Sequence, residues 1–170
     1  MHAVGLGDFT VRRANESDAD TMAGIDAIAS TGDAERRANI ARWCRQGSAT
    51  VAEDASGRLL GYCVVEYTFF EQGFVAMLMV TPSARGRGVG HGLLNAAAAS
   101  CTTPKLFTST NVSNQPMQRL LGRAGWTPVG LVQPRRGGPR AVLPLRATGR
   151  ADTSVTGDVV GLGRVGSGQT

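Results

Sequence analysis

The stretch LMVTPSARGRGVGHGLL, from Leu78 to Leu94, runs from an apolar segment through a glycine-rich loop into a helix-forming segment. Three glycines stand at alternate positions of the loop: Gly86, Gly88 and Gly90. The first turn of a helix leaves about four N–H groups unpaired, and glycines let an anion approach that backbone closely. Arg85 and Arg87 add positive charge. The pattern predicts a phosphate-binding loop, and a plain glycine-rich turn is the alternative.

Two common phosphate loops do not fit this stretch. A Walker loop requires Lys followed by Ser or Thr after its last glycine, whereas Gly90 is followed by His91 and Gly92. A dinucleotide-binding unit requires an acidic residue about 20 positions further on. Here no acidic residue follows until Asp152.

Working outward, alternation and turn residues predict a mixed α/β chain with a partly antiparallel sheet. The strands expected from these signals are residues 9–14, 49–53, 59–70, 74–80, 105–110, 126–131 and 141–145. The expected helices are residues 15–29, 33–46, 89–100 and a capped segment ending near 125. The run 74–80 is apolar throughout, which predicts a central strand covered on both faces.

A chain of 170 residues is long enough for one domain, which we expect at residues 1–147. Residues 148–170 are rich in Gly, Ser and Thr and are predicted to form a disordered tail. No apolar run approaches the ~20 residues of a membrane helix, and the start of the chain lacks a secretory pattern. Three cysteines without metal-ligand spacing, Cys44, Cys63 and Cys101, suggest buried thiols. We therefore expect a cytoplasmic protein without a metal site.

Charge is unevenly distributed along the chain. Residues 1–71 carry a net charge of −4, whereas residues 72–151 carry ten basic and no acidic side chains. This acid-free half indicates an anionic partner such as a nucleic acid, an acidic protein or a phosphorylated cofactor. Its arginines are scattered without interleaved aromatic residues, so we do not expect nucleic-acid binding.

The central stretch resembles the R/Q-x-x-G-x-G/A motif of the GNAT-type N-acetyltransferases, which Arg85, Gly88 and Gly90 match. A second family pattern, N-x(6)-L-Y-x(3)-G-F, is met in part by the residues Asn114, Leu120, Gly125 and Trp126. A subgroup pattern is similar to residues 69–74, 77–80 and 105–120. The resemblance covers about residues 9–147.

The resemblance implies a GNAT-like acyl-CoA N-acyltransferase fold. That fold has a largely antiparallel sheet of six to seven strands with a splayed central pair, and about four helices. It also implies acetyl-CoA as co-substrate and a primary amine as acceptor. The residues implied to bind acetyl-CoA are Leu78, Met79, Val80, Arg85, Gly86, Arg87, Gly88, Val89, Gly90 and Asn114. An acid-free half then has a purpose, since a carboxylate near the pyrophosphate would repel it.

Direct transfer requires that a base or a water chain take the proton of the amine. Family members often carry a glutamate on the fourth strand and a tyrosine after the asparagine, but Ala76 and Leu121 stand there. The candidate bases are Glu71 and Glu66, each of which is alternatively a solvated polar residue. Tyr67 and His91 are weaker candidates for proton transfer.

Three functions remain open from the sequence. The first is an N-acetyltransferase acting on an unidentified small molecule or protein, as a monomer or homodimer without a membrane partner. The second is a catalytically weak or inactive acyl-CoA-binding sensor or interaction protein of the same fold, because the expected acid and base are missing. The third is a nucleic-acid-binding module, which the scattered arginines disfavour.

Overall fold

The computed structural model describes residues 4–5, 8–133 and 140–149. Within them, the strands are β1 (Val4–Gly5), β2 (Phe9–Arg13), β3 (Ala49–Asp54), β4 (Leu59–Phe69), β5 (Gln72–Val80), β6 (Lys105–Thr108), β7 (Thr110–Asn111), β8 (Thr127–Val132) and β9 (Ala141–Ala147). The helices are α1 (Ala19–Ile25), α2 (Ala34–Gln46), α3 (Val89–Ser100) and α4 (Gln115–Arg123). Three short 3-10 helices accompany them: η1 (Glu16–Asp18), η2 (Ala29–Thr31) and η3 (Pro82–Ala84).

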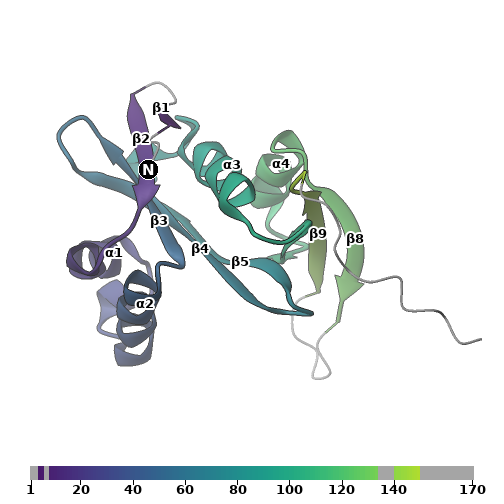
Figure 1. The fold of residues 1–170 in the computed structure, drawn as a ribbon, viewed down its shortest axis with the longest axis horizontal. Coiled ribbons are helices and arrows are strands. Elements are labelled where there is room, and N and C mark those ends of the chain that lie inside the picture. Colours follow the sequence, from purple (N-terminus) through teal and green to yellow (C-terminus); the bar gives the residue numbers. More distant parts are fainter. Residues whose placement is uncertain (1–3, 6–7, 134–139, 150–170) are drawn as a thin grey trace, which may run out of the picture.

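The described strands form one sheet in the order β1-β2-β3-β4-β5-β6-β9-β7, with β8 paired to β9 (Figure 1). Every pairing is antiparallel except that of β5 with β6. The predicted mixed, largely antiparallel sheet with four α-helices is confirmed. The strand count exceeds the expected six to seven because β1 and β7 are two-residue strands, which are too short to show a hydrophobic alternation.

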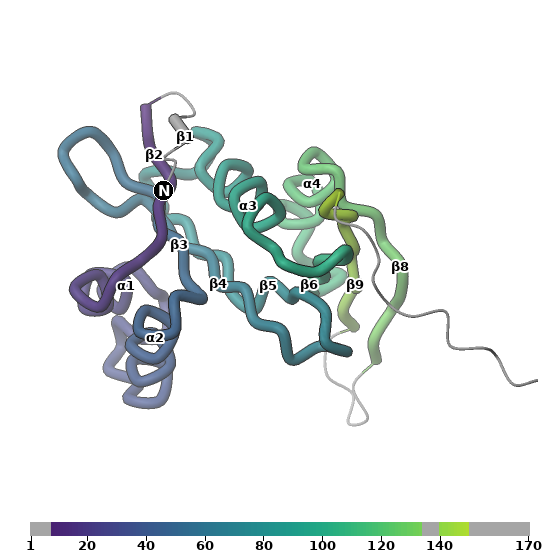
Figure 2. The backbone as a smooth tube through the Cα atoms, viewed as in Figure 1, coloured from purple at the N-terminus to yellow at the C-terminus, as the bar shows by residue number. Residues whose placement is uncertain are grey.

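Helices α1 and α2 lie on one side of the sheet and α3 and α4 on the other (Figure 2), and the sheet separates two hydrophobic cores. Helices α1 and α2 pack on one face around buried Met22, Ile40 and Tyr62. Helices α3 and α4 pack on the other face with Leu93, Leu94, Leu106 and Leu121. Side chains alternate between the faces of a strand, so Tyr62 and Cys63, neighbours on β4, enter different cores.

The first helix ends earlier than its apolar spacing predicted. The sequence pattern predicts a helix to about Ala29, but α1 stops at Ile25. Asp26 leaves the helical conformation and its Oδ1 accepts the amide hydrogens of Ile28 and Ala29, at 2.8 and 2.7 Å. An aspartate that bonds nearby backbone in this way competes with helix propagation, and the chain continues as η2.

Strand β4 and strand β5 form a tight hairpin in place of the expected linker at residues 71–73. Its two turn residues, Phe70 and Glu71, have φ angles of +49° and +56°. Such angles at both central positions match the right-handed twist of the flanking strands. The cost is local strain, because neither residue is a glycine.

Some predictions concern the ends of the chain and its cysteines. Cys44, Cys63 and Cys101 are buried thiols that form no disulfide, as predicted. Thr148 bonds back to Thr103 and Pro104, whereas residues 150–170 of the predicted tail lie outside the described residues. None of the helices within the described residues has the length and apolar character that a membrane crossing requires.

Candidate active site

The candidate site forms where β5 and β6 separate. The two strands pair in parallel only over the first part of β5, where Gly73 to Val75 face Leu106 to Thr108. The Thr108 hydroxyl donates to the Val75 carbonyl at 3.0 Å and closes this pairing. Beyond it β5 pairs with β4 alone, while the chain after β6 turns to β9. This is the predicted splayed central pair.

The backbone of β5 presents free groups along this opening. The amide of Thr81 donates to the Leu60 carbonyl of β4 at 2.9 Å. Because hydrogen-bonding directions alternate along an antiparallel pair, the N–H and C=O groups of Val80 and Leu78 point away from β4. Those of Met79 point toward β4. Two of the three predicted pantetheine-binding residues thus offer their main chain to the opening.

The expectation that β5 is covered on both faces was wrong for its second half. Residues 76–80 are all half-buried, although they are apolar throughout. The reason is the departure of β6, which removes the cover that a central strand normally has. An apolar, partly uncovered strand of this kind is typical of a ligand site.

The glycine-rich loop follows directly and leads into α3. Gly86 and Gly88 have φ angles of +77° and +82°, a conformation that glycine adopts without steric cost. Gly88 is the N-cap of α3, and no side chain caps the helix. The first helical hydrogen bond is donated by Gly92 to the Gly88 carbonyl at 2.9 Å. The amides of Val89, Gly90 and His91, which precede Gly92 in the first turn, therefore lack intrahelical acceptors and are available to an anion.

Two exposed arginines flank these amides. The guanidinium groups of Arg85 and Arg87 make no hydrogen bond or ion pair with another described residue. Only their backbone amides are bonded, to the carbonyls of Pro82 and Ala84 at 3.4 Å. No acidic residue occurs between positions 72 and 151, so the positive charge of the loop is not offset by its sequence neighbours. Together with the helix terminus, this arrangement suits a polyphosphate.

Packing brings the loop, the strand edge and α4 together at Gly90. A β-carbon at Gly90 would lie 3.0 Å from Leu120 Cδ2 and 3.6 Å from Val80 Cγ2. The neighbouring Val89 is buried in the core. The small residue therefore allows α3, α4 and β5 to converge where the predicted cofactor-binding residues lie.

The asparagine of the second family pattern begins α4. Asn114 Oδ1 accepts the Met117 amide hydrogen at 3.2 Å, so this oxygen caps the helix. Its Nδ2 group has no partner among the residues described and is available as a donor. Leu121, at the position of the family tyrosine, is 2% exposed in the α3–α4 core and offers no proton donor.

His91, in the first turn of α3, is hydrogen-bonded to a side chain one turn further along the same helix. Its Nδ1 lies 3.0 Å from Asn95 Nδ2, and Asn95 Oδ1 accepts a hydrogen bond from Arg146 of β9 at 2.8 Å. Since the Asn95 amide nitrogen is a donor, Nδ1 of His91 is the acceptor of this hydrogen bond. The chain of contacts fixes α3 to β9.

A cleft of about 500 Å³ lies on the other face of the sheet, between α2 and β5. The helical side contributes Ile28, Asp33, Glu35, Arg36, Asn39 and Trp43. The strand contributes Ala76 and Met77. A bulge explains why these two consecutive residues both line it, because Val64 and Val65 of β4 face Met77 and Val75 and leave Ala76 as the extra residue.

Glu66 lies behind this cleft rather than in its lining. Its Oε1 accepts hydrogen bonds from Trp43 Nε1 at 3.0 Å and from Arg42 Nη1 at 3.1 Å. The side chain is 24% exposed, and its second oxygen, Oε2, has no hydrogen bond to any described residue. Glu66 therefore anchors Trp43, a cleft residue, and keeps one free oxygen.

The structure does not bring Glu71 or Tyr67 into the cleft lining. Glu71 is exposed in the β4–β5 turn, next to Phe70, which is 83% exposed. Tyr67 points to the face opposite Glu66, where its hydroxyl accepts the Thr102 amide hydrogen at 3.0 Å. Adjacent residues of a strand face opposite ways, so only one of Glu66 and Tyr67 can lie near α2.

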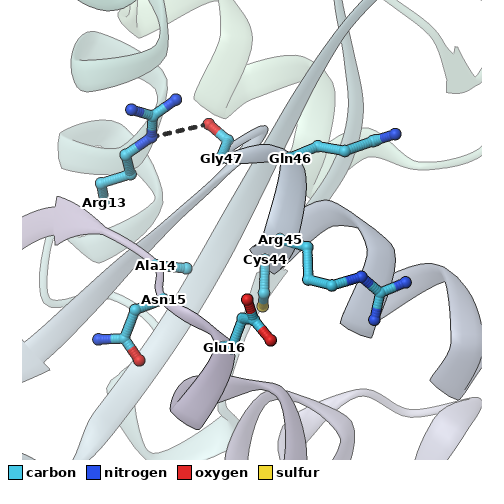
Figure 3. A pocket seen from close by; sticks show the side chains of 8 residues that line it. All are labelled: Arg13, Ala14, Asn15, Glu16, Cys44, Arg45, Gln46 and Gly47. Carbon is cyan, nitrogen blue, oxygen red and sulfur yellow. Dashed lines mark hydrogen bonds between the residues drawn. The ribbon is translucent and has the colours of Figure 1, made fainter.

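A second cleft, of about 350 Å³, lies where β2 ends beside the last turn of α2 (Figure 3). Its contacts are structural. Arg13 Nε donates to the Gly47 carbonyl at 3.1 Å, at the C-terminal end of α2. A cation at the C-terminal end of a helix interacts favourably with the helix dipole. This interaction explains the position of Arg13, so no ligand is needed to explain it.

Sequence reasoning missed the helical side of the larger cleft. Arg36, Asn39 and Trp43 recur at positions i, i+3 and i+7 of α2 and so share one face. This face of α2 combines a charged, a polar and an aromatic residue. The solvent-facing side of a surface helix is normally polar throughout, so the aromatic residue is unusual there. It is the signal that could have located the cleft.

The chain matches the model of the Acetyltransferase (GNAT) family over residues 20–126. It is similar to an acetyltransferase of the GNAT family from Bacillus cereus, with 27% identity, a TM-score of 0.76, and coverage of 83% of this chain and 98% of the other. A ribosomal-protein-S5-alanine acetyltransferase from Vibrio fischeri shares 13% identity, with a TM-score of 0.64 and coverage of 88% and 98%. No curated protein gave a significant match.

A spermidine N-acetyltransferase chimera from Vibrio cholerae is also similar in fold, with 15% identity, a TM-score of 0.65, and coverage of 84% and 97%. The family match spans more than half of the chain, and the splayed strands and glycine-rich loop agree with it. The protein belongs to the GNAT acetyltransferase family. Acyl transfer is the activity that this family membership supports.

Proposed function

We propose that this protein transfers the acetyl group of acetyl-CoA directly to a primary amine. The observation that carries the proposal is the opening of the sheet after Val75, which leaves the Leu78 and Val80 backbone free beside the glycine-rich loop. Pantetheine carries amide groups that can pair with such an edge, and its pyrophosphate suits the loop. The residues present therefore fit the co-substrate.

Each part of the site has a role in holding acetyl-CoA. Leu78 and Val80 pair with the pantetheine arm, and Met79 between them sets their orientation through β4. The loop and first turn hold the pyrophosphate with these residues: Arg85, Gly86, Arg87, Gly88, Val89 and Gly90. Asn114 donates through Nδ2 while its oxygen caps α4.

Acetyl-CoA supplies an activated thioester whose acetyl carbon accepts a nucleophile. In the overall reaction the nitrogen of the neutral amine bonds to that carbon, the carbon–sulfur bond breaks, and the proton lost by the nitrogen is balanced by the proton that the departing thiolate takes up, so that CoA leaves as thiol. The protein must orient the amine and accept its proton. The amide of Leu78 or Val80 is suited to stabilise the carbonyl oxygen.

Glu66 is the candidate that fits proton removal, acting through water. Its free Oε2 lies on the α2 face of the sheet, where Trp43 joins it to the cleft. Glu71 remains a prediction with weaker support, since it lies in the exposed hairpin turn. A thiol leaves without strong acid assistance because its pKa is about 8.5, so the loss of a family tyrosine at Leu121 is tolerable.

A specific observation favours the alternative of an acyl-CoA-binding sensor. Ala76 lines the cleft at the position where the family resemblance implies a glutamate, and Glu66 is already paired with Arg42. A sensor of this kind would bind acetyl-CoA with the same loop and release no thiol.

Titration calorimetry with acetyl-CoA, followed by thiol release over a panel of amines, tests both functions. We expect binding by the wild type and an affinity lowered about threefold to tenfold in Arg85→Gln and Arg87→Gln, since each loses a charge-assisted contact. Arg45→Gln, which removes an exposed arginine from α2, is the matched control and should bind normally. Absence of binding at millimolar acetyl-CoA would exclude both functions, and binding without thiol release would favour the sensor.

Two further predictions accompany the proposal. The three buried thiols, none of them in a disulfide, agree with a reducing compartment, and we place the protein in the cytoplasm. The oligomeric state, monomer or homodimer, stays a prediction that size-exclusion chromatography with light scattering decides.

A further inference from the structure

Arg36 holds an unmatched positive charge in the cleft between α2 and β5. Its side chain is half-buried, and no carboxylate of the described residues lies within ion-pair distance of it. Its Nη1 atom instead contacts Met77 Sδ at 2.8 Å. A guanidinium that loses water without gaining a carboxylate is destabilising, so this placement calls for an explanation.

The other arginines of α2 show that the placement is particular to Arg36. Arg37 Nε donates to the Ala29 carbonyl at 3.1 Å. Arg42 is paired with Glu66 and also bonds Gln46 and Asn39. Arg45 is exposed on the far side of the helix, where it lines the smaller cleft (Figure 3). Only Arg36 reaches from α2 across to β5 in the larger cleft.

None of the acidic side chains near Arg36 in the described residues forms an ion pair with its guanidinium. Asp26 lies close enough for the charge of Arg36 to help lower its pKa, but its oxygens already accept from Tyr62, Ile28 and Ala29. Asp33 Oδ1 accepts the Arg36 backbone amide as the cap of α2. Glu35 is exposed at the rim. The guanidinium therefore keeps N–H donors for a ligand.

Arg36 also lies at the end of the cleft that is next to the strand edge assigned to acetyl-CoA. Met77, its contact, follows Ala76, and both residues belong to the bulge of β5, just beyond the point where β5 and β6 cease to pair. The free edge at Leu78 and Val80 begins one residue further on. A ligand group bound by Arg36 is thus held beside the strand segment to which the thioester is assigned.

This inference rests on the proposed function and adds the class of acceptor. We propose that Arg36 binds the α-carboxylate of a free α-amino acid, whose α-amine receives the acetyl group. A guanidinium presents paired N–H donors that match the two oxygens of a carboxylate. Because the arginine contacts Met77, the residue next to the strand edge assigned to the thioester, the carboxylate and the amine must be close together, as they are across one carbon atom.

The rest of the cleft suits the remainder of such a molecule. The acceptor side chain lies along Ile28 and Trp43, with Asn39 as a polar contact. A polyamine has no carboxylate for Arg36, and a peptide amino terminus has an uncharged amide in that place. Both are therefore poor acceptors for this cleft.

Matched acceptors test the proposal directly. Initial rates of thiol release are measured with the 20 common L-amino acids, their α-amides, and the corresponding decarboxylated amines. We expect kcat/KM for at least one free acid to exceed that for its amide and its amine by tenfold or more. Arg36→Gln should lower kcat/KM for that acid at least tenfold, mainly by raising KM, and leave the value for the amide unchanged.

Two controls keep the result interpretable. Arg45→Gln removes an arginine from the same helix outside the cleft and should behave as wild type. Arg36→Gln should retain its thermal unfolding midpoint and its acetyl-CoA affinity, which shows that the variant is folded and that only the acceptor site has changed. Arg36→Lys keeps the charge but not the paired donors and should have an intermediate KM.

The outcomes separate this inference from the proposed function. If the wild type does not bind acetyl-CoA, both fail. If it binds acetyl-CoA but acetylates amides or decarboxylated amines as well as the free acids, or acetylates no amino acid at all, the assignment of Arg36 is overturned alone. An unchanged KM in Arg36→Gln overturns it as well.

Discussion

The phenol of Tyr62 donates a hydrogen bond to the carboxylate of Asp26, 36 residues earlier in the chain, and both side chains are fully buried. The other carboxylate oxygen accepts the amide hydrogens that follow α1. This contact joins the segment between α1 and α2 to β4, the strand that pairs with β5. The Tyr62–Asp26 pair therefore helps to hold the helical wall of the cleft against its strand floor.

Removing the phenol oxygen should cost stability. Burial, and then Asp26, raises the pKa of Tyr62 above its ordinary value, so the phenol stays protonated and remains a donor. In Tyr62→Phe one buried carboxylate oxygen loses its partner, and we expect a loss of about 1–3 kcal/mol in the free energy of unfolding. Urea denaturation measures it. Tyr67→Phe removes a hydrogen bond from the exposed Thr102 amide, which water can replace, so it should change stability by less than about 0.5 kcal/mol. Equal losses in the two variants would contradict this role.

Acid should destabilise the protein through two aspartates. Hydrogen bonds from Arg12 lower the pKa of Asp18, and bonds from Tyr62, Ala29 and Ile28 outweigh burial to lower that of Asp26. A carboxylate with a depressed folded-state pKa contributes stability above its unfolded pKa of about 3.9, and this stability is lost as pH falls through the folded value. Unfolding free energy should therefore decrease from about pH 5 downward.

Single amide variants assign this pH dependence. Asp18→Asn and Asp26→Asn should each be less stable than wild type at pH 7 and should each show a shallower fall below pH 5. Asp20→Asn, at an exposed position of α1, serves as the control and should follow the wild-type curve. Urea midpoints measured at half-unit intervals give the result, and a full wild-type slope in both variants would refute the assignment.

A methyl group at position 61 should disturb the strand edge assigned to acetyl-CoA. Gly61 faces Val80 across the β4–β5 ladder, and a β-carbon there would lie 2.4 Å from the Met79 carbonyl oxygen. Since this neighbour is backbone, β5 must move, and we expect Gly61→Ala to cost about 1–3 kcal/mol. Thermal unfolding and acetyl-CoA titration should both show a loss. Gly57→Ala is the control: a β-carbon there meets nothing within 4 Å, and φ is +81°. Backbone strain should cost about 1–2 kcal/mol of stability, but acetyl-CoA affinity should stay unchanged, so affinity is the discriminating measurement.

The two candidate bases should differ in their effect on turnover. Glu66→Gln retains an acceptor for Trp43 but cannot take a proton, and we expect kcat to fall about 100-fold. Glu71→Gln, in the exposed turn, should change kcat less than about twofold. Thiol-release kinetics decide between them. A large fall in Glu71→Gln with an active Glu66→Gln would reverse the assignment, and full activity in both would assign proton removal to water alone.

Much of the fold followed from local signals in the sequence. The predicted helix at residues 89–100 matches α3 residue for residue, because glycines before it and alanine-rich periodicity within it act over a few positions. The strands were also placed within a few residues, since alternation and turn residues are local. The charge contrast between the two halves required no structure at all.

The availability of each charged group was decided only by tertiary structure. Glu66 is bonded to Trp43, 23 residues away, and Arg36 contacts Met77, 41 residues away. Neither contact follows from the periodicity of one helix or one strand, because each depends on how two elements pack across the sheet. The sequence by itself determined the glycine-rich loop and the strand that precedes it. Packing decided where β6 leaves that strand, which carboxylates are already paired, and which arginine faces the cleft.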